Sequence, residues 1–379
     1  MRGRRLRVYL AGTSFKPSYG GPAISVASLA RALALAGAEV GVWAPDRSTP
    51  YAWPEKEQGV QSLSGTVKES LDAFGSTSVI HDNGIWLPHN HALCRRASEL
   101  QVPRVVSVRG MLEPWALRHK AWKKRLAWQV YQERDLRRAA SHHATSEREA
   151  DHLRRFGMGV PITTIPNGID LPSRPELCRL RSARLSRGDK IALFLGRLYP
   201  VKGLPMVVEA WARVRPKGWS LVIAGPDEAG HRAEIERAVR RHGLTQQVSL
   251  PGPVAPQDRL SVYAAADLFI LPSYSESFGM AVGEALACGL PVVTTTETPW
   301  SQITVRGCGW RVAPTVEGLA SALRDATSSD AATLIDMGAN GREYVAAEFG
   351  WSAVAKRMIA LYRNIVAGAA DIGSVAAEV

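Results

Sequence analysis

Two glutamates, Glu276 and Glu284, stand eight positions apart in the stretch Glu-Ser-Phe-Gly-Met-Ala-Val-Gly-Glu. The apolar run Leu268 to Leu271 precedes it, and Ala285 to Cys288 continues it as a helix. A loop of Ser and Gly that opens a helix offers free backbone N–H groups and a positive dipole end, which suit an anion such as phosphate. A carboxylate accepts hydrogen bonds from hydroxyl groups but repels phosphate. We therefore expect the two glutamates to hold diols on either side of a bound pyrophosphate.

The competing interpretation is that Glu276 and Glu284 are solvated surface residues, because charged side chains are mostly exposed. Two nearby cations favour a binding site over this competing interpretation. Arg197 and Lys202 follow Ile191 to Leu195, an uninterrupted apolar run typical of a buried parallel strand. Both would lie in the loop at the carboxyl end of that strand, where a fork-shaped guanidinium and a compact ammonium suit a diphosphate.

Strands and helices alternate through the second half of the chain, which predicts a doubly wound α/β domain. Gly225-Pro226-Asp227 and Gly252-Pro253-Val254 end two of its strands on the same edge. The backbone groups at Gly225 and Val254 would line a pocket for a nucleobase, although Gly-Pro turns are common in any loop.

The first half opens with the order strand, glycine-rich loop, helix, strand, which predicts a Rossmann-like βαβ unit. These elements are expected over Arg7 to Ala11, Thr13 to Gly21, Pro22 to Ala36 and Glu39 to Ala44. Gly20 and Gly21 would let the backbone approach a ligand closely. The spaced-glycine fingerprint of dinucleotide binding is missing, so we expect no NAD site.

A polar segment, His81-Asp82-Asn83-Gly84-Ile85-Trp86, follows the short strand at Val79 and Ile80. We expect this segment to be a loop at the carboxyl end of the strand, where open α/β sheets bind ligands. Arg109-Gly110 would lie on the same edge, after the strand from Arg104 to Val108. The alternative is that Asp82 and Asn83 only form a turn and that Trp86 packs in the core.

The segment Pro114 to Ala140 is the most basic of the chain, with aromatic residues at roughly helical spacing. Its cations are Arg118, Lys120, Lys123, Lys124, Arg125, Arg134, Arg137 and Arg138, and its aromatic residues are Trp115, Trp122, Trp128 and Tyr131. Such a helix can lie on an anionic membrane surface, where each cation adds on the order of 1 kcal/mol. The alternative is a long surface helix that buries its Trp face in the domain core.

With 379 residues, of which 46% are hydrophobic and 22% charged, the chain is long enough for two globular domains. It has no apolar stretch of about eighteen residues and no signal-peptide core after Met1-Arg2-Gly3-Arg4-Arg5, so we expect a cytoplasmic protein. Four scattered cysteines predict neither a zinc site nor a disulfide framework. The net charge of +12 predicts an anionic partner, which is a nucleic acid, a membrane surface or a phosphorylated substrate.

Together these motifs resemble those of the family-4 retaining glycosyltransferases (glycosyl transferases group 1) of the GT-B fold, in the same order over nearly the whole chain. The resemblance rests on Gly196-Arg197-Leu198, Lys202-Gly203, the stretch from Glu276 to Glu284, Pro166-Asn167-Gly168-Ile169-Asp170 and the Gly20-Gly21 loop. The segment from Thr298-Pro299-Trp300 to Gly307-Cys308-Gly309-Trp310 further resembles a subgroup found among bacterial surface polysaccharide and lipopolysaccharide enzymes.

The family implies two Rossmann-like domains that face across a cleft, and we place them at residues 1–170 and 189–350. We expect residues 171–188 to be a linker, residues 351–367 to be a helix that crosses back to the first domain, and residues 368–379 to be a tail. The resemblance also implies that a nucleotide sugar binds mainly to the C-terminal domain and that no metal or other cofactor is required.

Carried over by position, the resemblance implies that Arg197 and Lys202 hold the pyrophosphate and that Glu284 takes the ribose hydroxyls. Glu276 would take the donor hexose. The remaining donor contacts would come from the backbone near Phe278, Gly279 and Met280 and, from the N-terminal domain, near Gly20 and Gly21. The acceptor side would contain His81, Asp82, Asn83 and Trp86.

Many relatives present a His at the end of the fourth N-terminal strand, where this chain has Arg109. We expect Arg109 to contact the acceptor or a phosphate, with His81 and Asp82 as alternatives for that role. The expected reaction is a front-face displacement with retention, in which a donor phosphate oxygen takes the acceptor proton.

The sequence leaves the donor sugar, its base (uridine or guanosine) and the acceptor open. A nucleotide-sugar epimerase on the same fold is an alternative, as is a phosphorylase, for which we find no pyridoxal lysine. A nucleic-acid-binding protein is suggested by the charge alone, and no recognition motif accompanies the basic residues.

Overall fold

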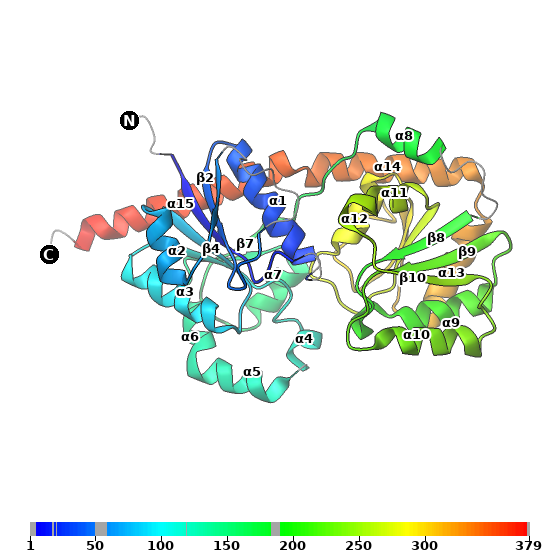
Figure 1. The fold of residues 1–379 in the computed structure, drawn as a ribbon, viewed down its shortest axis with the longest axis horizontal. Helices are drawn as coiled ribbons and strands as arrows, with labels where there is room; N and C mark the ends of the chain where they lie inside the picture. Colours follow the sequence, from blue (N-terminus) through cyan, green and yellow to red (C-terminus); the bar gives the residue numbers. More distant parts are fainter. Residues whose placement is uncertain are drawn as a thin grey trace. The chain divides into compact units, whose positions relative to one another are not determined.

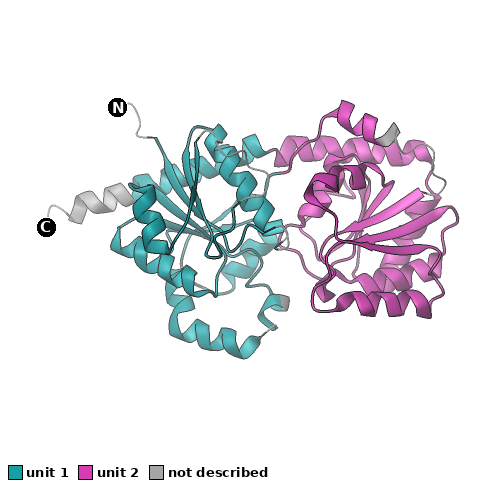
Figure 2. Ribbon diagram, viewed as in Figure 1, with its two compact units in different colours: residues 1–168, 351–379 teal, residues 169–350 magenta. Residues whose placement is uncertain are grey.

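The computed structural model describes residues 5–16, 19, 21–49, 59–118, 120–182 and 190–376. The chain divides into two compact units, of which unit 1 comprises residues 1–168 and 351–379 and unit 2 comprises residues 169–350 (Figure 2). Each unit is a parallel sheet with helices on both faces (Figure 1). The prediction of two doubly wound α/β domains is therefore confirmed.

Unit 1 contains a seven-stranded sheet in the order β3-β2-β1-β4-β5-β6-β7. The strands are β1 (Arg7–Ala11), β2 (Glu39–Trp43), β3 (Val60–Leu63), β4 (Val79–Asn83), β5 (Arg104–Ser107), β6 (Ser141–Ala144) and β7 (Ile162–Thr164). The helices are α1 (Gly21–Leu35), α2 (Val67–Phe74), α3 (Pro88–Glu99), α4 (Pro114–Arg118), α5 (Ala121–Ala127), the π-helix η2 (Trp128–Gln132), α6 (Glu133–Arg137), α7 (Glu147–Arg154) and α15 (Trp351–Ala376).

Both faces of the unit 1 sheet are covered, and β1 shows how its residues divide between them. Val8 and Leu10 lie in a core with α1 and α15, whereas Tyr9 and Ala11 lie in a core with α2 and α3. Successive side chains of a strand point to opposite faces. A strand that is buried on both faces therefore has the nearly continuous apolar sequence from which it was predicted.

Unit 2 contains a six-stranded sheet in the order β10-β9-β8-β11-β12-β13. The strands are β8 (Lys190–Leu195), β9 (Trp219–Ala224), β10 (Val248–Gly252), β11 (Leu268–Leu271), β12 (Val292–Thr295) and β13 (Gly309–Val312). The helices are α8 (Arg174–Ser182), the 3-10 helices η3 (Pro200–Lys202) and η4 (Pro256–Asp258), α9 (Leu204–Val214), α10 (His231–Arg241), α11 (Arg259–Ala264), α12 (Met280–Ala287), α13 (Val316–Ser328) and α14 (Ala331–Phe349). Helices α9, α10 and α13 cover one face of the sheet, and α11, α12 and α14 cover the other (Figure 1).

Several segments differ from what the sequence predicts, and the short strand β13 is one that was not predicted. Part of the expected linker is helix α8, whose Leu177 is buried in the unit 2 core and whose Leu180 packs against that core. Helix α15 runs to Ala376, beyond the expected end at residue 367, since no proline or charged cluster interrupts it. Strand β3 and helix α2 were not predicted, because both are short.

The basic segment Pro114 to Ala140 is not one helix. Helix α4 ends at Arg118, and Lys120 has a φ of 51°, which interrupts the helical path before α5 begins. From Ala121 the chain then passes through the π-helix η2 into α6, which ends at Arg137. In the part of the chain that the structure describes, no helix is both long enough and apolar enough to cross a membrane.

Candidate functional site

The strand order of the unit 2 sheet reverses between β8 and β11. Open α/β sheets bind ligands at the carboxyl ends of the strands where the order reverses. Strand β8 ends at Leu195, shortly before Arg197 and Lys202, and β11 ends at Leu271, shortly before Glu276. Two predicted cations and one predicted glutamate therefore meet at the switch point of this sheet.

Lys202 and Glu276 form an ion pair across the switch point. Lys202 ends η3, and the following Gly203 has a φ of 65° and a backbone so close to β11 that a Cβ would lie 2.3 Å from the Pro272 carbonyl oxygen. The tight turn thus fixes the lysine against the β11 loop. The Ser273 hydroxyl donates to the same glutamate oxygen, Oε1, at 2.7 Å.

Glu284 lies on α12 and is held by two residues of α11. The Arg259 guanidinium and the Tyr263 hydroxyl both donate to its Oε2, the latter at 2.7 Å. Burial alone would lower the pKa of Arg259, but the adjacent Glu284 carboxylate raises it above the ordinary value. Burial, and then the same carboxylate, raises the pKa of Tyr263 well above its usual range. Both donors therefore stay protonated.

The two glutamates share one arrangement, in which one carboxylate oxygen is bonded to a cation and a hydroxyl and the other is open. Among the described residues, nothing donates to Oε2 of Glu276 or to Oε1 of Glu284. The two side chains are 11% and 20% exposed, so both are screened from water but not sealed. An open carboxylate oxygen in such a place accepts a hydrogen bond from a ligand hydroxyl.

Arg197 is paired with Glu228 at 2.7 Å, and both side chains are exposed. The backbone N–H of Glu228 donates to the Leu198 carbonyl oxygen at 3.1 Å, which holds the two loops together. An exposed ion pair contributes little free energy, about 0 to 1 kcal/mol. A phosphate that reaches Arg197 therefore meets weak competition from Glu228.

The predicted loop before α12 is present, and its residues have different structural roles. The Phe278 side chain is buried against Trp300, whose Nε1–H donates to the Phe278 carbonyl oxygen at 2.7 Å. Gly279 has a φ of 79°, which permits the turn into α12 at Met280. The loop thus offers a ligand the first N–H groups of the helix, which have no acceptor within it.

Gly225 and Val254 lie at the same edge of the sheet, and close packing accounts for the presence of these residue types there. Gly225 has a φ of 145°, and a Cβ there would lie 1.8 Å from the Gly196 carbonyl oxygen. Val254 is half-buried and packs against the unit 2 core. Their contribution to a nucleobase pocket stays a prediction.

In unit 1, the predicted loop at residues 81–86 is wrong in its first half, because β4 extends to Asn83 and pairs with β1 and β5 on both sides. His81 is buried between the Tyr362 hydroxyl and the Ser107 hydroxyl, each 2.6 Å from a ring nitrogen. Asp82 is buried with Arg104 at 2.9 Å and Asn90 at 2.8 Å.

Burial dominates the electrostatics of this edge. It lowers the pKa of His81 well below its ordinary value, and the neighbouring His143 lowers it further. Burial also raises the pKa of Asp82 to about 6, although Arg104 opposes that rise. His81 and Asp82 are buried, and their polar atoms are hydrogen-bonded to other residues of unit 1. Neither side chain is therefore exposed to a sugar acceptor.

Arg109 lies in the turn that follows β5 and has a φ of 52°, an uncommon backbone conformation for a non-glycine residue. Its Nε and Nη2 donate to Asn83 Oδ1 at 3.1 and 2.6 Å, and its Nη1 donates to Asn167 Oδ1 at 2.7 Å. Burial lowers its pKa to about 10. Among the described residues no carboxylate forms an ion pair with it, although the Glu149 carboxylate opposes the fall of its pKa, so Arg109 is a half-buried cation whose hydrogen-bond partners are neutral amides.

Trp86 also has a positive φ, 79°, which is rare for a bulky side chain. Its N–H donates to Gln132 Oε1 and its carbonyl oxygen accepts from the Tyr131 hydroxyl, both at 2.7 Å. The residue therefore ties the end of β4 to η2. Gly21 begins α1, and Gly20 lies outside the described residues.

Five residues around these sites were not predicted: Arg259, Tyr263, Ser273, Glu228 and Glu149. Buried Glu149 accepts from the backbone N–H of Gly110 and from Thr145, and so shapes the turn after Arg109. Arg259 and Tyr263 are four residues apart on α11, which places them on one helix face. The four-residue spacing can be seen in the sequence, but the sequence does not show that these two side chains face Glu284.

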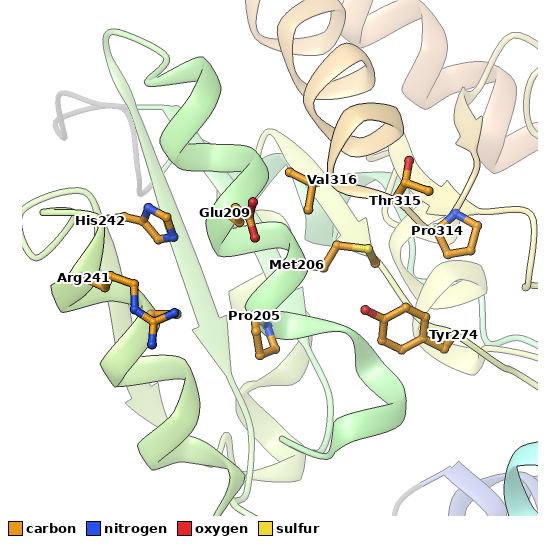
Figure 3. A pocket seen from close by; sticks show the side chains of 10 residues that line it. Pro205, Met206, Glu209, Arg241, His242, Tyr274, Pro314, Thr315 and Val316 are labelled. Atoms are coloured by element: carbon orange, nitrogen blue, oxygen red, sulfur yellow. The ribbon is translucent and has the colours of Figure 1, made fainter.

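A separate pocket of about 360 Å³ lies beside this site in unit 2 (Figure 3). Figure 3 shows Tyr274 and Thr315 on one side and Arg241 and His242 on the other, with α9 between them. Its lining includes none of the residues predicted to bind a donor.

Both halves of the chain match known family models. Residues 180–344 match the family described as Glycosyl transferases group 1, and residues 20–168 match the Glycosyl transferase 4-like domain. D-inositol 3-phosphate glycosyltransferase 2 from Catenulispora acidiphila is 32% identical over 259 residues, which cover 59% of this chain and 56% of that protein. The chain spans about half the length of the curated relatives it matches.

Two solved structures share the fold over nearly the whole chain. Sucrose-phosphate synthase from Thermosynechococcus elongatus has a TM-score of 0.78 at 24% identity and covers 96% of this chain and 100% of its own. HepE from Anabaena in complex with UDP and glucose has a TM-score of 0.74 at 19% identity and covers 95% and 100%. At these identities the likeness concerns the fold alone.

Proposed function

Because the chain belongs to the family-4 glycosyltransferases and has the GT-B fold, we propose that it transfers a hexose-type sugar from a UDP- or GDP-sugar to a hydroxyl of a glycan or lipid-linked acceptor. The single observation that carries this proposal concerns Glu276 and Glu284 of unit 2. Each has one carboxylate oxygen bonded to a cation and a hydroxyl, and one to which no described residue donates. Two open carboxylate oxygens with cations beside them suit a ligand that has hydroxyl groups at both ends and a pyrophosphate between.

In the proposed reaction, Arg197 and Lys202 meet the charge that grows on the diphosphate as the sugar–phosphate bond breaks. Fixed cations of this kind stabilise a transition state most where charge develops. The acceptor hydroxyl oxygen bonds to the anomeric carbon on the face from which the diphosphate leaves, so the anomeric configuration is retained, and a donor phosphate oxygen takes the acceptor proton. We propose that the two cations and the start of α12 suffice for the leaving group without a metal.

For Arg109 we propose contact with an anionic group of the substrates. The support is that its half-buried guanidinium donates only to the amide oxygens of Asn83 and Asn167 and that Glu149, which opposes the fall of its pKa, forms no ion pair with it, since burying a charge without a directly paired counter-charge is costly. An arriving anion would remove that cost. Glu149 and the left-handed backbone at Arg109 then hold the guanidinium in a fixed direction.

We also propose that the acceptor is met at an anionic membrane surface, with the protein peripheral on the inner face of the membrane. Trp122, Leu126 and Val130 follow one another at four-residue spacing and are 68%, 56% and 65% exposed. Lys123 and Arg125 are exposed beside them. An apolar stripe flanked by cations is the pattern of an interfacial helix. We further propose a role in bacterial surface polysaccharide or lipopolysaccharide synthesis, and a location at the membrane agrees with that role.

Vesicle flotation tests the membrane proposal. The protein should float with vesicles that contain phosphatidylglycerol and stay behind with pure phosphatidylcholine. Trp122→Ala should weaken flotation, whereas Ile335→Ala, which truncates an equally exposed apolar residue of unit 2 (64%), should not. Equal behaviour of the two variants would contradict the assignment of the stripe.

A thermal-shift screen of UDP- and GDP-sugars tests the proposed donor class. A donor at about 100 times its dissociation constant stabilises the folded state by roughly 2.7 kcal/mol, so one base series should raise the melting temperature. With the donor found, NMR should show sugar transfer only when an acceptor is added. Interconversion of the donor without an acceptor would instead identify an epimerase, and a screen without any shift would contradict the donor proposal.

A further inference from the structure

Glu284 is not a free carboxylate, because Arg259 and Tyr263 hold one of its two oxygens. Both come from α11, one helical turn apart, and both donate to Oε2. A carboxylate oxygen has two lone pairs, so these two donors saturate Oε2. Oε1 is the oxygen left for a ligand.

We infer that Arg259 is a positioning residue for ribose recognition: with Tyr263 it fixes Glu284 so that Oε1 alone accepts from the nucleotide ribose. This inference rests on the proposed binding of a nucleotide sugar at Glu284. Without the two donors the carboxylate could rotate and present either oxygen. With them, the direction of its remaining acceptor is set before the ligand arrives.

The surroundings of the three residues support a fixed arrangement. Tyr263 is buried and its ring lies against Phe269 of β11, so its hydroxyl cannot follow a moving carboxylate. The Arg259 side chain is 29% exposed and has Glu284 as its only ion-pair partner among the described residues. The Glu284 carboxylate helps to raise the pKa of both donors above their ordinary values, so both carry their protons at neutral pH.

A positioning role can be separated from a general structural role by comparing nucleotides with and without a hydroxyl. Calorimetric titration would use UDP, GDP and their 2′- and 3′-deoxy forms against the wild type, Arg259→Ala and Arg259→Lys. The control is Arg213→Ala, which breaks an exposed Arg–Glu pair elsewhere in unit 2. Circular dichroism and melting temperature verify that each variant is folded.

The wild type should bind the ribonucleotide about tenfold more tightly than the weaker of its deoxy forms, the value of one hydrogen bond to a charged group. In Arg259→Ala this preference should fall to about threefold or less, because the carboxylate is no longer directed. Arg259→Lys should restore part of it, and Arg213→Ala should leave it unchanged. Tyr263→Phe, which removes only a hydroxyl, should reduce the preference in the same direction.

Two results would overturn the inference. If Arg259→Ala weakens the ribonucleotide and the deoxynucleotides equally, Arg259 acts on the phosphates or on the fold and not through Glu284. If it leaves every affinity unchanged, it has no part in binding. Failure of the wild type to bind UDP or GDP at all would instead contradict the proposed function, and the inference with it.

Discussion

The carboxyl ends of the two sheets both carry polar side chains, but these side chains are in opposite states. In unit 1, His81 and Asp82 are enclosed, and partners from their own unit occupy their polar atoms. In unit 2, Glu276 and Glu284 each keep one oxygen without a donor among the described residues. The difference teaches that a polar residue at a sheet edge marks a site only if some of its hydrogen-bonding capacity is left over.

The same contrast separates the cations. Arg104 in unit 1 is buried in an ion pair with Asp82, which holds the sheet together. Arg197 in unit 2 is paired in the open, where exchange for another anion costs little. Arg109 is the exception in unit 1, because it is half-buried and its hydrogen-bond partners are neutral amides. We therefore expect substitutions in unit 2, and at Arg109, to affect the reaction, and substitutions at His81 and Asp82 to affect stability.

The largest effect is expected at Lys202. Lys202→Ala removes a cation from the developing charge of the diphosphate and should lower kcat by about 100- to 1000-fold. The folded structure should persist, because the side chain is only one partner of a pair at the edge of the unit. Steady-state kinetics measures kcat, and circular dichroism shows whether the variant is folded. Full activity of the folded variant would remove Lys202 from the site.

Glu276 should separate transfer from binding. Glu276→Ala leaves the ribose contact at Glu284 intact, so the affinity for UDP or GDP should change by about threefold or less, while kcat falls by roughly 100-fold because the hexose is no longer oriented. Calorimetry and a transfer assay on the same preparation give the two numbers. Equal losses in both would mean that the two glutamates do not have separate roles.

In unit 1 the expected loss is one of stability. His81→Ala leaves the buried Tyr362 hydroxyl without its partner, at about 1–3 kcal/mol for the unsatisfied group, whereas the Ser107 hydroxyl keeps its bond to His143. Denaturant titration should show this loss in the free energy of unfolding. Nucleotide affinity, measured well below the new melting temperature, should stay within about twofold. A stable variant with weakened nucleotide binding would reverse the comparison.

The smallest effect is a dependence of stability on pH. Burial lowers the pKa of His142 to about 4 and that of His143 to about 3. The unfolded chain binds these protons below about pH 6.5, so each histidine costs up to roughly 1.4 kcal/mol of stability per pH unit as the pH falls further. Asp82 opposes them, because its raised pKa, about 6, makes the folded state bind its proton first.

The net expectation is a free energy of unfolding that decreases from pH 7 to pH 5. Replacing His143 by Gln should flatten that decrease by up to about 1.4 kcal/mol per pH unit, the largest share of one histidine. Denaturant titrations at several pH values measure the slope. A slope that is unchanged in the variant would show that His143 already titrates normally in the folded state.

The sequence predicts unit 2 better than unit 1, for physical reasons. Around Glu276 the determinants are local, because the strand, the glycine turns and the cations lie within short segments whose order fixes their place on the sheet edge. Around His81 the decisive partner is Tyr362, which is 281 residues away and belongs to the final helix. A polar run before a glycine has the same appearance whether it ends a strand or begins a loop.

Partners that come from a neighbouring helix escape prediction for the same reason. The four-residue spacing of Arg259 and Tyr263 shows that they share a face, but only the packing of α11 beside α12 shows that this face meets Glu284. The break at Lys120 was also invisible, since lysine favours helices and only the folded chain shows its left-handed backbone. Local propensity therefore predicted the elements, and tertiary contacts decided their ends and their partners.

We propose that Glu284 of unit 2, with its one open carboxylate oxygen, binds the nucleotide, and that the enclosed polar residues of unit 1 do not. Calorimetric titration of UDP and GDP into the wild type, Glu284→Ala and His81→Ala tests it most directly, since both variants truncate a polar residue to the same methyl group. We expect an affinity at least about tenfold weaker for Glu284→Ala, the value of a hydrogen bond to a charged group, and an affinity within about twofold of the wild type for His81→Ala. The opposite order, or equal losses in the two variants, would contradict it.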